Sequence, residues 1–369
     1  MRRVPLARRN FFQDRRRASL SIGGVAVALL LVLVLEAVFA GAIVQVTAYL
    51  RHLPAQAIVS QRGVETMHMS SSALPPGVVD DTRRVRGVAW VEGIGFTTGT
   101  VSSAGGRQLS YMIGYDARTG RGGPWDMARG ALPADGQVVL DEIAADNLGV
   151  GVGDRVQALG RAFQISGLSA GGSSITNTVT FMRIEDYHAI RGDAISYLLV
   201  GARPGVSPDT LSRRLAAALP AATVQTRDQF VREESRVVRD MSADVMQIMS
   251  LIGFLIALAV VALTLFAATL SKLREYAVVK ALGASSWRLG GTVIGQAIIA
   301  TALALSVAVI LTYGLGAALA ATTPNVRLAV EVPTVVRVAT AALVVGVAGA
   351  LAPLRRLARI DPAAAFRRA

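Results

Sequence analysis

The sequence is poor in the residue types that most often carry chemistry. It has no cysteine, three histidines and two lysines among 369 residues. Without cysteine no disulfide can brace a folded domain, so any domain outside the membrane must be held by its hydrophobic core. Lys272 and Lys280 follow Ser271 and Val279, whereas a P-loop needs a lysine after a glycine. The chain therefore has no ATP site of this kind, and if ATP is used, a partner must bind it.

The histidines do not indicate a hydrolase. Asp186 lies two residues before His188, but we identify no serine in a strand–turn–helix elbow of the G-x-S-x-G type. A solvated loop is the favoured interpretation of His188. The stretch Met67, His68 and Met69 combines thioether and imidazole groups, which suit Cu(I) or haem iron. Adjacent ligands rarely close a site alone, and apolar packing or lipid contact is the commoner role of such methionines. We therefore assign no metal ligand and no catalytic residue.

Long apolar runs, by contrast, are abundant. The chain is 52% hydrophobic, and its mean hydropathy is +0.48. A spanning helix needs about 20 mostly apolar residues to cross roughly 30 Å of hydrocarbon. We predict four spans, near residues 19–46, 245–270, 291–321 and 333–354. The first run exceeds the about 7–15 apolar residues of a signal peptide, so we interpret it as a retained span. Its arginine-rich start and the letters VFAGA keep a cleaved signal peptide as the alternative.

Charge predicts the orientation. Residues 1–17 hold seven Arg and one Asp, residues 271–288 four Lys/Arg and one Glu, and residues 355–369 five Arg and one Asp. Residues 49–244 hold 20 Arg and 20 Asp/Glu. Because positive loops stay cytoplasmic, we place both termini and residues 271–288 on the cytoplasmic side of the cell membrane. Residues 49–244 are placed on the outer side. The excess positive charge is juxtamembrane and attracts anionic lipid; we expect no nucleic-acid partner.

The predicted fold class is an integral-membrane α-helical protein with an α+β extracytoplasmic domain between the first and second spans. Seven short strands are predicted between residues 88 and 202, separated by Gly, Asp and Pro. Two helices are predicted near DEIAADNLG and SPDTLSRRLAAALP; Ser207 caps the second and Pro220 ends it. Both the helix from Ser19 to Leu50 and the one approaching the second span extend beyond the hydrocarbon. We favour a stalk over two ordinary membrane-entry helices.

Two charged residues fall inside apolar runs. Glu36 lies near the outer boundary of the first span, and an ionisable group at such depth usually faces a partner or a wet cavity. Cavity lining and simple interfacial exposure both remain open. Arg337, four residues into the last span, can extend its head to the interface and needs no special role. The candidate substrate or cavity residues are therefore Glu36, Met67, His68 and Met69.

The loop SKLREYAVVKALGASSWRL is predicted to contain a bounded helix, which a loop that only sets the topology would not need. One apolar face is predicted, formed by Ala277, Val278, Ala281 and Leu282. Gly283 is placed to stop the helix with a left-handed cap. A short helix bounded in this way has a fixed angle to both neighbouring spans. A cytoplasmic partner that grips it would move the two spans as levers. The alternative is a plain positive loop that only sets topology.

At this point the sequence resembles the FtsX/MacB-type ABC permeases. LREYAVVKALGAS resembles their cytoplasmic coupling helix, PLRRLARIDPAAAFRR their carboxy-terminal signature, and GQVVLDEIAADNLGVGVGDRVQALGRAFQISGL the conserved part of their outer domain. The resemblance implies a non-enzymatic permease subunit that works by mechanotransmission. It also implies the following ATPase-coupling residues: Arg274, Glu275, Lys280, Ala281, Gly283 and Ala284.

The resemblance further implies the partners. Two copies of an ABC ATPase subunit would bind ATP and Mg, this chain would carry no cofactor, and a second permease subunit, expected to be another copy, would complete the complex. The substrate would be hydrophobic or amphipathic and exported or extracted from the membrane. One rival is an FtsX-like regulator that relays ATP-driven motion to an extracytoplasmic enzyme such as a cell-wall hydrolase. Another is a membrane-anchored sensor without an ATPase.

The expected domain boundaries follow from these elements. They are a basic cytoplasmic helix 1–18, the first span and stalk 19–48, the outer domain 49–226, a stalk and second span 227–270, the coupling helix 271–288, the third span 289–322, a short outer loop 323–332, the fourth span 333–354 and a cytoplasmic tail 355–369.

Overall fold

The computed structural model divides the chain into two units. It describes residues 15–68, 70–75, 77–174, 177–271, 278, 280, 285–322 and 328–351. The first unit, here the membrane unit, comprises Met1–Gly41, Ser242–Thr322 and Arg327–Ala369, and the second, the outer unit, comprises Ala42–Met241 and Thr323–Val326. Each unit is described by itself.

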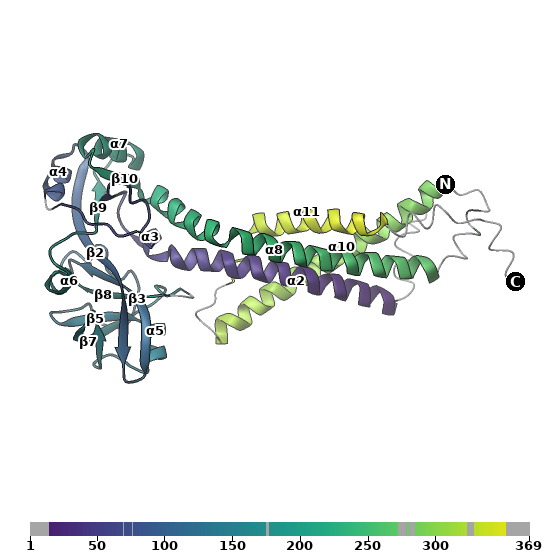
Figure 1. The fold of residues 1–369 in the computed structure, drawn as a ribbon, viewed down its shortest axis with the longest axis horizontal. Helices are drawn as coiled ribbons and strands as arrows, with labels where there is room; N and C mark the ends of the chain where they lie inside the picture. The colour runs from purple at the N-terminus through teal and green to yellow at the C-terminus, as the bar shows by residue number, and fades with distance from the viewer. Residues whose placement is uncertain are drawn as a thin grey trace. The chain divides into compact units, whose positions relative to one another are not determined.

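The membrane unit is built from long apolar helices. They are α2 (Arg15–Val46), α8 (Arg227–Ser271), α10 (Ser286–Thr322) and α11 (Val332–Gly349), of which α2 and α8 also enter the outer unit (Figure 1). Each contains one stretch long and apolar enough to cross a membrane: Ile22–Val46, Ala243–Leu263, Gly290–Thr322 and Val332–Gly349. The prediction of four transmembrane helices, with the outer domain between the first and the second, is confirmed.

Small side chains let these helices approach closely. On α10 the fully buried residues Ala297, Ala304 and Ala308 recur at helical spacing. A methyl group added at Gly346 of α11 would lie 2.5 Å from Thr301 Oγ1 on α10. Where lipid is as apolar as the side chains, such close backbone packing replaces the hydrophobic drive of a soluble core.

The outer unit is an α+β domain around a ten-stranded sheet. Its strands are β1 (Ala57–Gln61), β2 (Val88–Ser103), β3 (Gly106–Tyr115), β4 (Met127–Gly130), β5 (Gln137–Asp141), β6 (Arg155–Ala158), β7 (Arg161–Ser169), β8 (Thr178–Arg183), β9 (Tyr197–Ala202) and β10 (Ala222–Thr226). Its helices, besides the ends of α2 and α8, are α3 (Ala48–His52), α4 (Val78–Arg84), α5 (Glu142–Leu148), α6 (Ile184–Arg191) and α7 (Pro208–Ala218). All seven predicted strands are confirmed; β1, β4 and β10 were not predicted.

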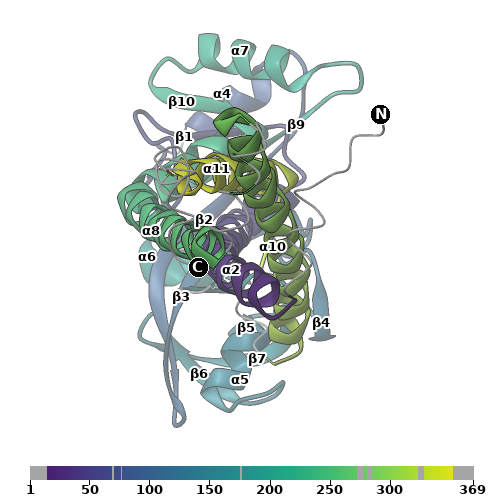
Figure 2. The same ribbon diagram turned by 90° about the vertical axis from the view of Figure 1, so that its right-hand side faces the viewer.

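Strand β2 joins the two halves of this sheet. Its first half, Val88–Ile94, pairs with β9, and its second half, Gly95–Ser103, pairs with β3. The strand order is β10-β1-β9-β2-β3-β8-β5-β7-β4. Because β6 pairs with both β2 and β7, six strands close into a ring, β2-β3-β8-β5-β7-β6. Figures 1 and 2 show α4 and α7 beside β9 and β10, at the opposite end of the unit from α5.

The alternation of side chains along the strands separates three cores. On β9, Tyr197 and Leu199 point into a core that also contains residues of α3 and α8, whereas Leu198 and Val200 point into a core with α7. The interior of the ring, with α5 and α6, forms the third core. Since side chains of a strand alternate between faces, β9 packs against α3 and the start of α8 on one face and against α7 on the other.

The close fit of α6 against the sheet yields a stability prediction. A methyl group at Gly95 would collide with the Tyr187 ring, whereas one at Gly77 meets no atom within 4 Å. We expect Gly95→Ala to lower the free energy of unfolding by about 1–3 kcal/mol, the usual cost of overpacking, and Gly77→Ala to leave it unchanged. Chemical unfolding of the full-length protein in detergent, followed by tryptophan fluorescence, measures both. Equal stability of the two variants would contradict this packing.

Candidate functional site

The predicted coupling segment lies mostly outside the described residues. Arg274, Glu275, Ala281, Gly283 and Ala284 fall there, so their predicted role stays a prediction. Lys280 is described, and it is helical and half-buried.

The Met67–His68 pair lies at a buried carboxylate in the outer unit; Met69 is outside the described residues. Glu234, on α8, has a fully buried side chain. Its Oε1 lies 2.5 Å from His68 Nδ1, and its Oε2 accepts the backbone N–H of Met67 at 2.7 Å. Both carboxylate oxygens therefore bind the segment that follows β1. Met67 is itself buried, which agrees with the packing interpretation of this methionine.

Aromatic rings surround this carboxylate. The Tyr111 ring stands edge-on to His68, with ring centres 4.5 Å apart, and the Phe96 ring lies 5.5 Å from that of Tyr111. Tyr111 Oη accepts a hydrogen bond from Asn177 Nδ2 at 2.6 Å. Burial, and secondly the charge of Glu234, raise the pKa of Tyr111 to about 12, while the Asn177 hydrogen bond opposes the shift. Tyr111 is thus neutral at physiological pH.

The start of α8 is fixed in the outer unit by a capping box. The backbone N–H of Thr226 donates to Gln229 Oε1 at 2.8 Å, and that of Gln229 donates to Thr226 Oγ1 at 3.2 Å. Arg227 donates from its backbone to Gln56 O and from Nη1 to Leu53 O, each at 3.2 Å. One turn later Phe230 is fully buried in the sheet core. The helix is therefore held by polar and apolar contacts together.

The end of the first helix is fixed to the same core. Helix α2 passes into α3 with a single turn residue, Thr47, whose Oγ1 donates to Ile43 O at 2.8 Å. In α3, Leu50 is fully buried, and Tyr49 Oη donates to Gly122 O at 2.8 Å. Rings of Trp125 and Phe181 pack around Tyr49. The segment that follows α2 and the first turns of α8 thus pack into the same core, and both α2 and α8 contain candidate spans.

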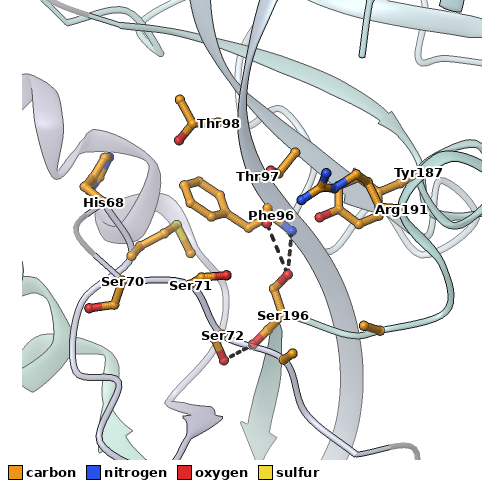
Figure 3. A pocket seen from close by; sticks show the side chains of 13 residues that line it. His68, Ser70, Ser71, Ser72, Phe96, Thr97, Thr98, Tyr187, Arg191 and Ser196 are labelled. Atoms are coloured by element: carbon orange, nitrogen blue, oxygen red, sulfur yellow. Dashed lines mark hydrogen bonds between the residues drawn. The ribbon is translucent and has the colours of Figure 1, made fainter. Parts of the chain in front are cut away.

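A pocket of about 360 Å³ adjoins the carboxylate site (Figure 3). Met67 and His68 line the pocket together with Phe96 of β2. Arg191 of α6 contributes a positively charged side chain to the lining. Ser196 Oγ lies between strand and loop: it accepts from the backbone N–H of Phe96 at 2.9 Å and donates to Phe96 O at 3.3 Å. Hydroxyl groups and one guanidinium suit a polar or anionic ligand. Within the described ranges, no cluster of three His, Asp or Glu side chains is placed to hold a metal ion.

One G-x-S-x-G pattern occurs in the sequence, and the interpretation of His188 requires correction. Residues 167–171 do spell G-x-S-x-G, but Ser169 is the buried last residue of strand β7, and its Oγ donates to Leu140 O at 3.4 Å. The described residues directly after it, 170–174, are not helical, so Ser169 does not lie in a strand–turn–helix elbow. His188 lies on helix α6 and not in a solvated loop. The pattern of that helix was missed because it is short and weakly amphipathic.

The membrane unit places Glu36 against a partner. Arg337 Nη2 of α11 lies 2.6 Å from Glu36 Oε2 of α2. The backbone N–H of Ala329 donates to Ala37 O at 3.0 Å, so the segment before α11 also contacts α2. The sequence interpretation of Arg337 did not include this ion pair. The two residues lie 301 positions apart, and no sequence spacing points to their pairing.

Two protein families match the chain. The MacB-like periplasmic core domain matches residues 18–218, and the FtsX-like permease C-terminal domain matches residues 247–362. No curated protein matches significantly.

Among solved structures, the extracellular domain of the noncanonic ABC-type transporter YknZ from Gram-positive bacteria is 14% identical, with a TM-score of 0.38 over 46% of this chain and 99% of that one. The periplasmic region of MacB from Actinobacillus actinomycetemcomitans is 15% identical, with a TM-score of 0.38 over 50% of this chain and 94% of that one.

The buried carboxylate yields a second stability prediction. Glu234→Ala removes one partner of a buried pair and leaves His68 and the Met67 N–H unsatisfied, so we expect a loss of about 3 kcal/mol. Its neighbour Glu233 is one-third exposed, and Glu233→Ala is expected to change stability by no more than about 0.5 kcal/mol. Denaturant unfolding of both variants compares them; similar values would refute the anchoring role of Glu234.

Tyr111 gives a prediction about pH. Its pKa in the folded protein lies at about 12, above the ordinary value of 10.0. Between these values the unfolded chain releases the proton and the folded chain keeps it, so its contribution to stability is complete below pH 10 and falls as the pH rises. Tyr111→Phe should make the loss of stability across this window shallower than in the wild type. Thermal unfolding at a series of pH values measures the slope, and an unchanged slope would refute the assignment.

Proposed function

The chain belongs to the FtsX/MacB-type family of ABC transporter permeases, and from this premise we propose that it couples ATP hydrolysis by a partner ATPase to conformational change in its outer unit. The motion would export, or extract from the membrane, a hydrophobic or amphipathic substrate. ATP and Mg would be bound by the partner, in two copies, one for each subunit of a permease homodimer.

One observation carries the proposal. Helix α8 runs unbroken for 45 residues and contains both the capping box of the outer unit and the candidate span Ala243–Leu263. An α-helix resists axial compression because each backbone hydrogen bond spans four residues. A displacement applied near Ser271 would therefore reach Glu234 and Phe230 with little loss. Those two residues are buried in the outer unit, so the motion would act on the sheet itself.

The opposite end of α8 leads directly into the proposed coupling segment. Glu275, Lys280 and Gly283 would form the contact that the ATPase grips. The ATPase needs only to bind two permease conformations with different affinity, since that difference sets how far the equilibrium moves. The pocket beside His68 would change shape with the movement of Glu234, because His68 lines the pocket and contacts that carboxylate.

The coupling role is tested by ATP hydrolysis in nanodiscs that contain the permease and its co-purified ATPase. We expect Glu275→Gln to reduce permease-dependent stimulation by about tenfold or more, as when one partner of an interfacial charge pair is removed. Gly283→Val should also reduce it, because a β-branched residue disfavours the left-handed cap proposed to end the coupling helix. Glu331→Gln, the same charge change at the exposed start of α11, should leave stimulation unchanged.

Normal stimulation in both coupling variants would eliminate the lever mechanism. Purification without any nucleotide-hydrolysing subunit would favour the sensor, and capture of a cell-wall hydrolase together with the ATPase would favour the regulator.

A further inference from the structure

Glu36 and Arg337 are the charged residues of their two candidate spans, and they meet in the membrane unit. The span Ile22–Val46 contains Glu36 as its one charge, and the span Val332–Gly349 contains Arg337 as its one charge. Their pairing at 2.6 Å neutralises both and joins α2 to α11. A charge at membrane depth is costly unless it is paired, and such residues commonly mark functional sites.

The two members of the pair differ in exposure. The Glu36 side chain is 17% exposed, whereas that of Arg337 is 66% exposed. Glu36 therefore faces the helices, and Arg337 reaches out from them. Within the part of the chain that the structure describes, Glu36 is the one hydrogen-bond partner of the guanidinium. A guanidinium has five N–H donors, so most of its donors face the surroundings of the protein.

Those surroundings determine the ligand. Arg337 lies five residues into α11, about 7.5 Å along the helix axis, which is within reach of lipid headgroups for a long side chain. Hydrocarbon supplies no acceptor for the remaining donors, and each unsatisfied polar group there costs several kcal/mol. A phosphate or carboxylate at the headgroup level would satisfy them, and the planar fork of arginine binds such groups through two hydrogen bonds.

We propose that Arg337 binds the anionic headgroup of an amphiphile in the leaflet next to the outer unit, and that Glu36 occupies the guanidinium when the amphiphile is absent. A cationic amphiphile would need Glu36 as its ligand, but that carboxylate is the more buried partner. The binding site stands on the geometry of the pair, while the identification of the amphiphile as the transported substrate class rests on the proposed function.

The experiment uses the absence of cysteine. Val344 is 65% exposed and lies seven residues beyond Arg337, which places it on the same helix face two turns further along. The substitution Val344→Cys therefore gives a single labelling site there. A lipid whose phosphate contacts Arg337 puts the middle of its acyl chain beside this position. The full-length protein, with a fluorophore attached to this cysteine, is placed in phosphatidylcholine nanodiscs. The nanodiscs contain a minor fraction of lipid that is spin-labelled in the middle of its acyl chain, either phosphatidylglycerol or phosphatidylcholine. Fluorescence quenching by the two lipids gives their preference.

We expect phosphatidylglycerol to be preferred at least about threefold, as for a charge-assisted contact. Arg337→Gln should abolish the preference, Arg337→Lys should keep part of it, and Glu36→Gln should increase it by removing the competing carboxylate. A label at Ile310→Cys, 69% exposed on α10, whose candidate span holds no charge, should show no preference. Equal quenching by both lipids in the wild type, or a lower preference in Glu36→Gln, would overturn the site.

Two further arms separate the sources of the anion. Dodecyl phosphate should relieve quenching by phosphatidylglycerol, and inorganic phosphate should not; relief by inorganic phosphate would overturn the proposal for an amphiphile. Because this readout needs no ATPase, its failure is distinct from that of the coupling mechanism. If quenching shows the lipid preference but the ATPase coupling test fails, Arg337 is a lipid-binding site and the proposed transport function is wrong.

Discussion

The outer unit depends on one buried carboxylate. Glu234 is the point at which α8 contacts the segment after β1, and both of its oxygens are used, one by a ring nitrogen and one by a backbone N–H. A buried charge is tolerated only with such complete pairing. Beside it, burial and secondly the charge of Glu234 raise the pKa of Tyr111 to about 12. Moving α8 along its axis therefore requires either that the loop follow the helix or that a buried charge lose its partners.

The membrane unit follows a different rule. Its helices pack through alanine and glycine, as Ala304 and Gly346 illustrate, and such contacts have no charge to lose when helices slide. Its one described ion pair within the spans, between Glu36 and Arg337, is the exception. Sliding of α11 against α2 would separate that pair, so an anionic amphiphile that replaces Glu36 would lower the cost of the movement. Under this proposal, binding of the amphiphile and movement of the helix would be linked through a single guanidinium.

The sequence predicted much of the fold because the signals were long or strongly patterned. Runs of more than 20 apolar residues and the alternation of β2, β3 and β9 do not depend on tertiary context. The missed elements were short: β4 has four residues and β10 five. The sites were predicted less well, because they join distant residues. Met67 and His68 were noticed for their side-chain chemistry, yet their partner, Glu234, lies in a charged stretch that reads as the solvated face of a helix. Likewise Glu36 and Arg337 each had an adequate explanation alone.

The two helices that reach the outer unit differ in one respect. Helix α8 is continuous from Arg227 to Ser271, whereas Thr47 separates α2 from α3, although the i to i−4 hydrogen bonds continue through it, from Thr47 N–H to Ile43 O and from Arg51 N–H to Thr47 O. There the hydroxyl bonds back to Ile43 O and also accepts from Arg51 Nε at 2.9 Å, and threonine back-bonding of this kind commonly bends helices. Under the proposed coupling, α8 would carry a load to the sheet without a break, and any bend of the first helix would fall at Thr47, next to the core that holds Tyr49 and Leu50.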